Sequence, residues 1–187
     1  MGKLEYYFKS QGFSKAELNT IIEAFELRQL SKGDYFVEEG KTSRFLGFID
    51  EGFFQFYIIQ DGVEKTIYSV GENNFVVSLV SFFKQLPARE NIRAVVDTSV
   101  WVIEKTMLKK LGTIIPAFKD FYIDILEWQI CCIDESRLDA IMLSAKERYI
   151  KMIDKEPELI RQIPLQYLAS ILGVTPRHLS RIRNEIR

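Results

Sequence analysis

Apolar residues change their spacing along the chain, and each change marks a new kind of predicted element. Residues 3–28 repeat apolar side chains every three or four positions, the period of an amphipathic helix, at Leu4, Tyr7, Phe8, Leu18, Ile21, Ile22 and Phe25. Ser14 precedes Glu17 by three residues, the spacing of a capping box, so we expect a helix to begin there.

Residues 30–105 switch to short aromatic and β-branched runs separated by turn signals. The turn signals are Lys32-Gly33-Asp34, Glu39-Gly40-Lys41, Asp50-Glu51-Gly52, Asp61-Gly62 and Gly71-Glu72-Asn73-Asn74. This rhythm predicts an all-β sandwich or barrel. The clearest hairpin turn is Asp61-Gly62, between the runs 53–59 and 63–70.

The helical period returns after residue 107, and a long helix is predicted from Pro116 to about Asp139. Some of its apolar residues follow the three–four spacing of a coiled-coil seam, namely Phe118, Phe121, Ile125, Trp128 and Cys132. Other apolar residues cover a second face, so this helix needs two partners. The simplest pair is the chain's own β-domain and a second copy of the chain. The alternative is a helix buried inside a monomer.

Composition and charge narrow the class of protein. The chain has 187 residues, with 25 Lys and Arg against 26 Asp and Glu, so a uniformly basic nucleic-acid coat is excluded while a local basic patch is not. His178 is the only histidine and Cys131-Cys132 are the only cysteines, which argues against a metal centre, a disulfide framework and a His-based catalytic triad. We therefore expect no catalytic residues and no metal. Without a signal peptide or a long apolar run, we expect a cytoplasmic protein that does not bind a membrane.

The strongest motif lies in residues 165–184, which read as two helices about a tight corner. Ala169 is small where the helices must cross closely, and Gly173 stands where the first helix ends. Thr175 is an N-cap and Pro176 a favoured first-turn residue. The apolar wedge between the helices is supplied by Leu168, Leu172, Val174, Leu179 and Ile182. This is the spacing of a helix-turn-helix, whose second helix enters the major groove of DNA. A capping box of Ser144 with Glu147 predicts another helix before it, to about Lys155.

The outward positions of the second helix are basic or polar. By periodicity they are Arg177, His178, Ser180, Arg181 and Arg183. Residues 161–187 hold five arginines against one glutamate, a net charge of +4, so the other 160 residues carry −5. Cationic charge on the reading helix is what phosphate binding requires, and arginine also offers a bidentate fork to guanine. The alternative is an ordinary helical hairpin with a solvated arginine face.

Taken together, these motifs resemble the cyclic-AMP receptor protein/fumarate–nitrate regulator (Crp/Fnr) superfamily of transcription factors. The resemblance rests on the ordered glycine turns of residues 32–75, the long helix and the helix-turn-helix. It implies an α+β fold with an N-terminal jelly-roll effector domain (residues 1–115), a dimerisation helix (116–143) and a DNA-binding domain (144–187). It also implies a homodimer on double-stranded DNA, with RNA polymerase and a small-molecule effector as further partners. By position, Arg181 matches the family's base-reading arginine, and Pro176 and Arg177 match its other two reading positions.

The sequence differs from the family pattern at positions that would contact the small-molecule effector. The implied pocket residues are Phe75, Ser78, Leu79, Arg89 and Ile133. Ser78 replaces the acid that contacts the sugar in cyclic-nucleotide-binding members, and Glu90 follows Arg89 where Ser or Thr would hold the phosphate. Ile133 and Asp134 stand where a hydroxyl pair would meet adenine. We therefore expect no response to cyclic AMP, no iron–sulfur cluster on the adjacent cysteines, and an unknown effector.

The sequence ends after the second helix of the motif, where many members of the family it resembles continue into a β-hairpin wing, so it is either a short-tailed member or a shortened chain. Without a wing, we expect phosphate binding to depend more on Gln166, Thr175 and the arginines. Two other functions have to be compared with the sequence. A cupin-type jelly-roll enzyme is disfavoured because the β-domain has no histidine. A small-molecule-binding module acting through a protein partner remains the alternative, with an apolar cavity lined by Phe54, Phe56, Phe75, Phe82 and Phe83.

Overall fold

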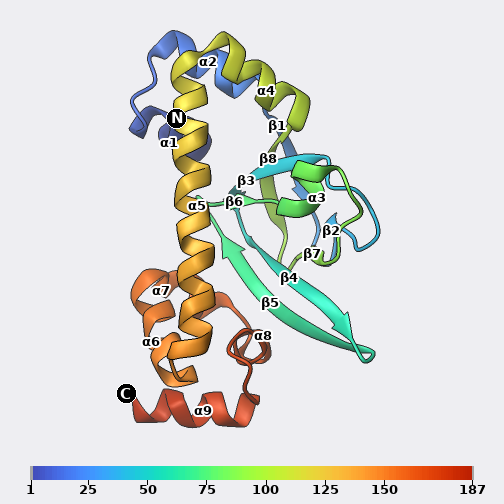
Figure 1. The fold of residues 1–187 in the computed structure, drawn as a ribbon, viewed down its shortest axis with the longest axis vertical. Coiled ribbons are helices and arrows are strands. Elements are labelled where there is room, and N and C mark those ends of the chain that lie inside the picture. The colour runs from blue at the N-terminus through green and yellow to red at the C-terminus, as the bar shows by residue number, and fades with distance from the viewer. Residues whose placement is uncertain (1, 187) are drawn as a thin grey trace. The chain divides into compact units, whose positions relative to one another are not determined.

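A computed structural model describes residues 2–186 of the chain (Figure 1). Its elements follow one another in the order α1 (Lys3–Ser10), α2 (Lys15–Glu23), β1 (Glu26–Leu30), β2 (Tyr35–Val37), β3 (Phe45–Glu51), β4 (Phe53–Gln60), β5 (Val63–Gly71), β6 (Phe75–Val76), α3 (Leu79–Lys84), β7 (Asn91–Ala94), β8 (Thr98–Glu104), α4 (Lys105–Ile114), α5 (Pro116–Met142), α6 (Ala145–Lys155), α7 (Pro157–Gln162), α8 (Leu165–Ile171) and α9 (Pro176–Glu185). The predicted α+β class, with a β-roll and a long helix, is confirmed.

Two four-stranded sheets form the β-roll, with strand orders β1-β8-β3-β6 and β2-β7-β4-β5. Strand β8 pairs antiparallel with both β1 and β3, so the last strand of the roll lies between two early ones. The predicted Asp61-Gly62 turn joins β4 to β5. Asp61 has φ +54° and Gly62 has φ +76°, the two positive values that a type I′ hairpin turn needs.

The chain divides into two compact units. Unit 1 holds the described residues up to Phe56 and the segment Val70–Leu126. Unit 2 holds Tyr57–Ser69, at the end of the β4–β5 hairpin, and the described residues from Glu127 onward. The domain boundaries expected from the sequence lie at residues 115 and 143. The division into units differs from them because it groups the hairpin end with the C-terminal helices and divides α5 within its length.

Unit 1 has two apolar cores. One fills the β-roll and includes Ile49, Phe54, Ile92 and Val100. The other joins α1, α2, α4 and the start of α5, with Phe8 and Phe118 among its most deeply buried side chains. The two cores anchor both the roll and the first turns of α5.

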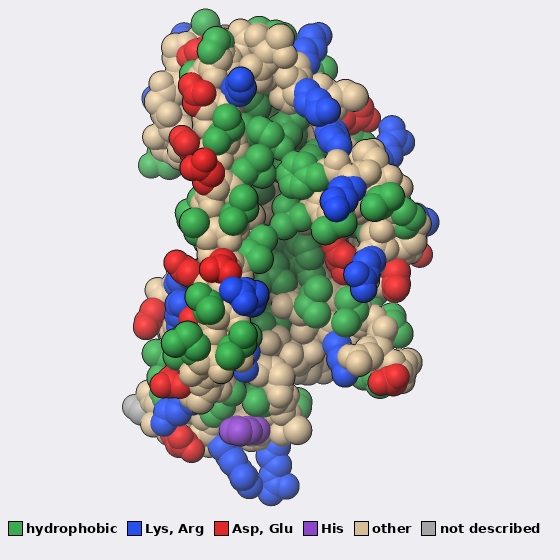
Figure 2. Space-filling model, viewed as in Figure 1, with side chains coloured by type: hydrophobic (Ala, Val, Ile, Leu, Met, Phe, Trp, Pro, Cys, Tyr) green, Lys and Arg blue, Asp and Glu red, His purple; other side chains and the backbone are tan. Residues whose placement is uncertain are grey.

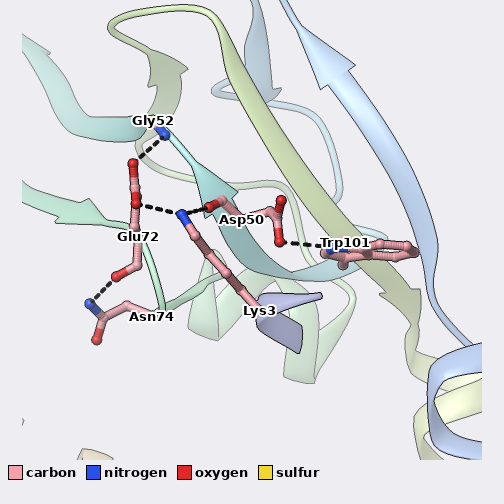
Figure 3. A network of polar contacts seen from close by, with 6 residues as sticks. All are labelled: Lys3, Asp50, Gly52, Glu72, Asn74 and Trp101. Carbon is pink, nitrogen blue, oxygen red and sulfur yellow. Dashed lines mark hydrogen bonds and ion pairs between the residues drawn. The ribbon is translucent and has the colours of Figure 1, made fainter. Parts of the chain in front are cut away.

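A polar network also attaches α1 to the β-roll (Figure 3). Lys3 donates from Nζ to the carbonyl oxygen of Asp50 (2.6 Å) and to a Glu72 carboxylate oxygen (2.7 Å). Glu72 also accepts the backbone N–H of Gly52 at 3.4 Å, and Trp101 donates its indole N–H to the Asp50 carboxylate at 3.4 Å. Exposed ion pairs of this kind contribute about 0–1 kcal/mol, so the network orients α1 more than it stabilises the fold.

Helix boundaries differ in places from those that periodicity predicts. Helix α2 ends at Glu23 although the apolar spacing continues to Phe25, because the chain then enters β1, where Glu26 pairs with Val102. Helix α5 runs to Met142, beyond the predicted end, and its 27 residues span about 40 Å. Both predicted capping boxes form, with Ser14 and Ser144 accepting from the N–H of Glu17 and Glu147. No helix within residues 2–186 has the length and apolarity needed to cross a membrane.

Candidate nucleic-acid interface

The corner between α8 and α9 is built from hydrogen bonds that end one helix and start the next. Val174 donates its N–H to the carbonyl of Ala169 (2.9 Å), and Gly173 donates to the carbonyl of Ser170 (3.0 Å). These two bonds define a Schellman C-cap, whose C′ residue needs a left-handed backbone. Gly173 supplies it with φ +68°. The glycine singled out in the sequence therefore ends α8.

Helix α9 begins as its sequence predicts. The Thr175 hydroxyl accepts the N–H of His178 at 3.2 Å, and Pro176 is the first helical residue. The Ser180 hydroxyl donates to the carbonyl of Pro176 at 2.9 Å, so it is engaged within the helix. Thr175 and Ser180 thus serve local structure, while Pro176 is exposed at the helix start.

Apolar residues fix α9 against α8. The side chains that meet between the two helices are nearly inaccessible, at Leu168, Ala169, Leu172, Leu179 and Ile182. Because all five are buried, α9 has one defined face toward α8 and one toward solvent. The orientation of the outward side chains follows from this packing.

Two arginines project from the outward face of α9. Arg177 and Arg181 are exposed, and neither makes an ion pair or side-chain hydrogen bond with any residue between 2 and 186. His178 is exposed beside them, and Figure 2 shows Lys or Arg side chains projecting next to this histidine. Gln166, the second residue of α8, is also exposed. Arg187, the last arginine of the basic segment, lies outside the described residues.

Arg183 is placed differently from the other two arginines of α9. Its Nε donates to the hydroxyl of Tyr149 at 2.9 Å, and its guanidinium carbon lies 5.6 Å from the centre of the Tyr149 ring. Tyr149 is a buried residue of α6. The expectation that Arg183 points outward to DNA therefore needs correction, because this guanidinium joins α9 to α6.

Two carboxylates of unit 2, Glu185 on α9 and Glu158 on α7, form ion pairs with cations. Lys146 donates to Glu185 at 2.9 Å, and this hydrogen bond lowers the pKa of the Glu185 carboxyl below its usual value. Glu158 pairs with Arg161 at 2.6 Å on α7. The charge left unpaired on the described part of α9 is positive, which favours a phosphate ligand.

Arg148 supports the same site from α6, and sequence reasoning missed it together with Tyr149. Its Nη2 donates to the carbonyl of Leu172 at 2.7 Å, where α8 ends. A cation at a helix C-terminus also meets the negative end of the helix dipole. These partners are distant in sequence and carry no motif, so no local pattern could reveal them.

Within the β-roll, Ser78 and Glu90 are brought together. Ser78 is buried and donates its hydroxyl to a Glu90 carboxylate oxygen at 2.6 Å. Arg89 is exposed and makes no ion pair with any described residue. The Glu90 carboxylate beside Ser78 disfavours a bound phosphate, because an anion site needs hydrogen-bond donors and a cation.

The remaining predicted pocket residues lie on three elements, β6, α3 and α5. Phe75 is half-buried and its ring packs 5.4 Å from the rings of both Tyr7 and Phe48, as part of the core. Leu79 starts α3 and is half-buried. Ile133 is on α5 and is 49% exposed.

Part of the predicted coiled-coil seam of α5 is buried within the chain itself. Phe118 is only 2% exposed, and Phe121 packs against the same core. These two side chains face their own chain, so assigning them to a surface for a second copy needs correction. Ile125 and Cys132 are half-buried, and Trp128 is exposed.

Among residues 2–186, no three His, Cys, Asp or Glu side chains are grouped to hold a metal ion. Cys131 is exposed and Cys132 is half-buried on α5, and neither forms a disulfide.

Comparison with known proteins identifies the fold. Residues 27–113 match the family of the cyclic nucleotide-binding domain. Among curated protein sequences, no match is found. The catabolite activator protein of Thermus thermophilus is 18% identical, with a TM-score of 0.59 and coverage of 94% of this chain and 84% of that one.

Two further solved structures have the same architecture. FixK2 from Bradyrhizobium japonicum is 15% identical, with a TM-score of 0.70 and coverage of 87% of this chain and 84% of that one. A regulator assigned to the Crp/Fnr family from Eubacterium rectale is 16% identical, with a TM-score of 0.64 and coverage of 94% and 84%. The matched domain and these structural likenesses show that residues 27–113 form a cyclic nucleotide-binding domain and that the chain shares the fold of these regulators.

Proposed function

We propose that this protein is a homodimeric, sequence-specific DNA-binding transcription regulator of the Crp/Fnr type that acts in the cytosol and does not respond to cyclic AMP. The observation that carries the proposal is the outward face of α9, where Arg177 and Arg181 are exposed and have no charged partner within residues 2–186, on a helix packed against α8. A helix presented in this way fits the major groove of B-form DNA.

The two arginines have different expected roles. Arg181 lies near the middle of α9, where a guanidinium can reach the O6 and N7 of guanine. Arg177 lies in the first turn, near the positive end of the helix dipole, where a phosphate is favoured. Arg181 therefore contributes specificity and Arg177 contributes affinity.

Dimerisation is supported by a second apolar row on α5. This α5 row consists of Ile123, Leu126, Ile130, Ile133, Arg137 and Ala140, which repeat with the three–four spacing of a heptad seam. Ile130 is 65% exposed and Ile133 is 49% exposed. A row of exposed isoleucines on a helix of this length is an interface for a second helix of the same kind.

Cyclic AMP is disfavoured by the buried contact of Ser78 with Glu90. Entry of a cyclic phosphate beside the Glu90 carboxylate would place two negative charges together. Isothermal titration with cyclic AMP is expected to give no binding heat. Binding at micromolar concentration would contradict this part of the proposal.

Selection of bound duplexes from a random DNA library tests the main proposal. The expected product is a two-fold symmetric site with half-sites about 34 Å apart. Arg181→Ala removes one base contact from each half-site, about 1–3 kcal/mol each, so it is expected to weaken binding of the dimer to that site by about 30-fold or more. Arg44→Ala is the matched control, because Arg44 is an exposed arginine of unit 1 that pairs with Glu104. No enriched sequence, or equal losses for the two variants, would contradict the proposal.

A further inference from the structure

The α5 row contains one charged residue within its apolar sequence. Its members from Ile123 to Ala140 are isoleucine, leucine or alanine except at Arg137. Arg137 stands at the same heptad position as Ile123 and Ile130, which lie fourteen and seven residues earlier. An arginine at that position is costly to bury in a paired helix, so its presence needs a reason.

Arg137 has a charged partner on its own helix. Its Nη2 and Nε donate to the same Asp134 oxygen at 2.8 and 3.1 Å. The Arg137 side chain is 62% exposed and the Asp134 side chain 58% exposed, so both are on the free surface of α5. Asp134 immediately follows Ile133 of the row, which places the ion pair at the margin of the apolar surface.

Only one way of pairing two such rows leaves the arginines together. In a parallel, in-register pair, Ile123, Ile130 and Ile133 each meet their counterparts, and Arg137 meets Arg137. A shift by one heptad sets Arg137 against Ile130, and an antiparallel pair sets it opposite Leu126. Both of these arrangements place an arginine in two layers of the seam instead of one, so two apolar layers are interrupted by charge.

We propose that Arg137 and Asp134 form a polar layer between two α5 helices, which fixes their parallel, in-register pairing and lowers the affinity of the dimer. This inference rests on the proposed homodimer. In the layer the aliphatic stems of the arginines pack at the seam and the guanidinium groups reach its margin. Each Asp134 offsets part of the repulsion between the two cations. The layer keeps the two α9 helices symmetric, as a two-fold DNA site requires.

Sedimentation equilibrium of the full chain measures the affinity. Arg137→Ile is expected to tighten the dimer by about tenfold or more, because well-packed apolar residues replace a charged layer. Asp134→Asn is expected to weaken the dimer, since it leaves the arginines uncompensated. Arg161→Ile is the matched control, because Arg161 is also an exposed arginine that pairs with an acid three residues earlier. This control is expected to leave the dimer unchanged.

Disulfide cross-linking measures the register. In a background with Cys131→Ser and Cys132→Ser, Ile130→Cys is expected to cross-link to its counterpart under mild oxidation by a copper complex. Adding Arg137→Ile is expected to reduce this product, because other registers become accessible.

A dimer that Arg137→Ile weakens or leaves unchanged overturns the inference but leaves the proposed homodimer intact. A monomeric wild-type chain, both free and on DNA, overturns the proposed dimer itself.

Discussion

The contact between Arg183 and Tyr149 predicts a structural role for Arg183, in contrast to the proposed DNA contacts of Arg177 and Arg181. Replacing Arg183 by alanine removes a hydrogen bond of 2.9 Å to a buried hydroxyl and a guanidinium–ring contact of 5.6 Å. The first contributes about 1–1.5 kcal/mol and the second about 0.5–1 kcal/mol. Arg183→Ala is therefore expected to destabilise unit 2 by about 1.5–2.5 kcal/mol. Tyr149→Phe removes only the hydroxyl and is expected to cause a smaller loss.

Urea unfolding followed by circular dichroism measures the stability of both variants. Under conditions where each variant stays folded, the salt dependence of DNA binding decides the role of Arg183. A phosphate contact adds about 0.9 to the slope of log K against log salt, whereas a structural arginine adds nothing. An unchanged free energy of unfolding combined with a smaller salt slope would refute the structural role and return Arg183 to the DNA surface.

Three other perturbations have expected results. In Gly173→Ala the added Cβ would have no atom within 4 Å, so the only cost is the left-handed backbone, about 1–2 kcal/mol in the free energy of unfolding measured with urea. Gly173→Asn is expected to lose less stability than Gly173→Ala, and an equal or larger loss would contradict this explanation. Hydrogen bonds from Ser144 lower the pKa of the Glu147 carboxyl, so the stability that this capping box contributes is present above the ordinary glutamate pKa and is lost as the pH falls through the lowered pKa. Ser144→Ala is expected to flatten the decline of the melting temperature at acidic pH. An unaltered decline would contradict this role of the capping box. Leu179→Ala empties a fully buried position between α8 and α9 and is expected to cost about 2–5 kcal/mol, with DNA binding lost as α9 loosens; a loss below about 1 kcal/mol would show that α9 is not held by this packing.

Local chemistry made much of the fold predictable. The capping boxes at Ser14 and Ser144, the positive-φ turn at Asp61-Gly62 and the corner at Gly173 are each specified by a few adjacent residues. Such signals do not depend on distant parts of the chain. The rhythm of turns indicated an all-β sandwich or barrel, the family resemblance implied a jelly roll, and the structure has a β-roll.

Features set by distant contacts were not predictable. Whether Arg183 faces DNA or Tyr149 is decided by a residue 34 positions away. The two faces of α5 could both be seen in the sequence, but which one its own chain covers depends on the core around Phe118. From periodicity alone, Phe118 and Phe121 were therefore assigned to the contact with a second copy. The burial of Phe118 and the exposure of Ile130 and Ile133 favour the α5 row for that contact instead.

The salt dependence of binding to a selected two-fold DNA site tests the central claim most directly. A dimer that presents two α9 helices loses two phosphate contacts when Arg177 becomes alanine, so the slope of log K against log salt is expected to shrink by about 1.8. Arg44→Ala, which removes the same charge from the β-roll, is expected to leave the slope unchanged. An unchanged slope for Arg177→Ala, or the same change for both variants, would contradict the assignment of α9 as the DNA-binding element.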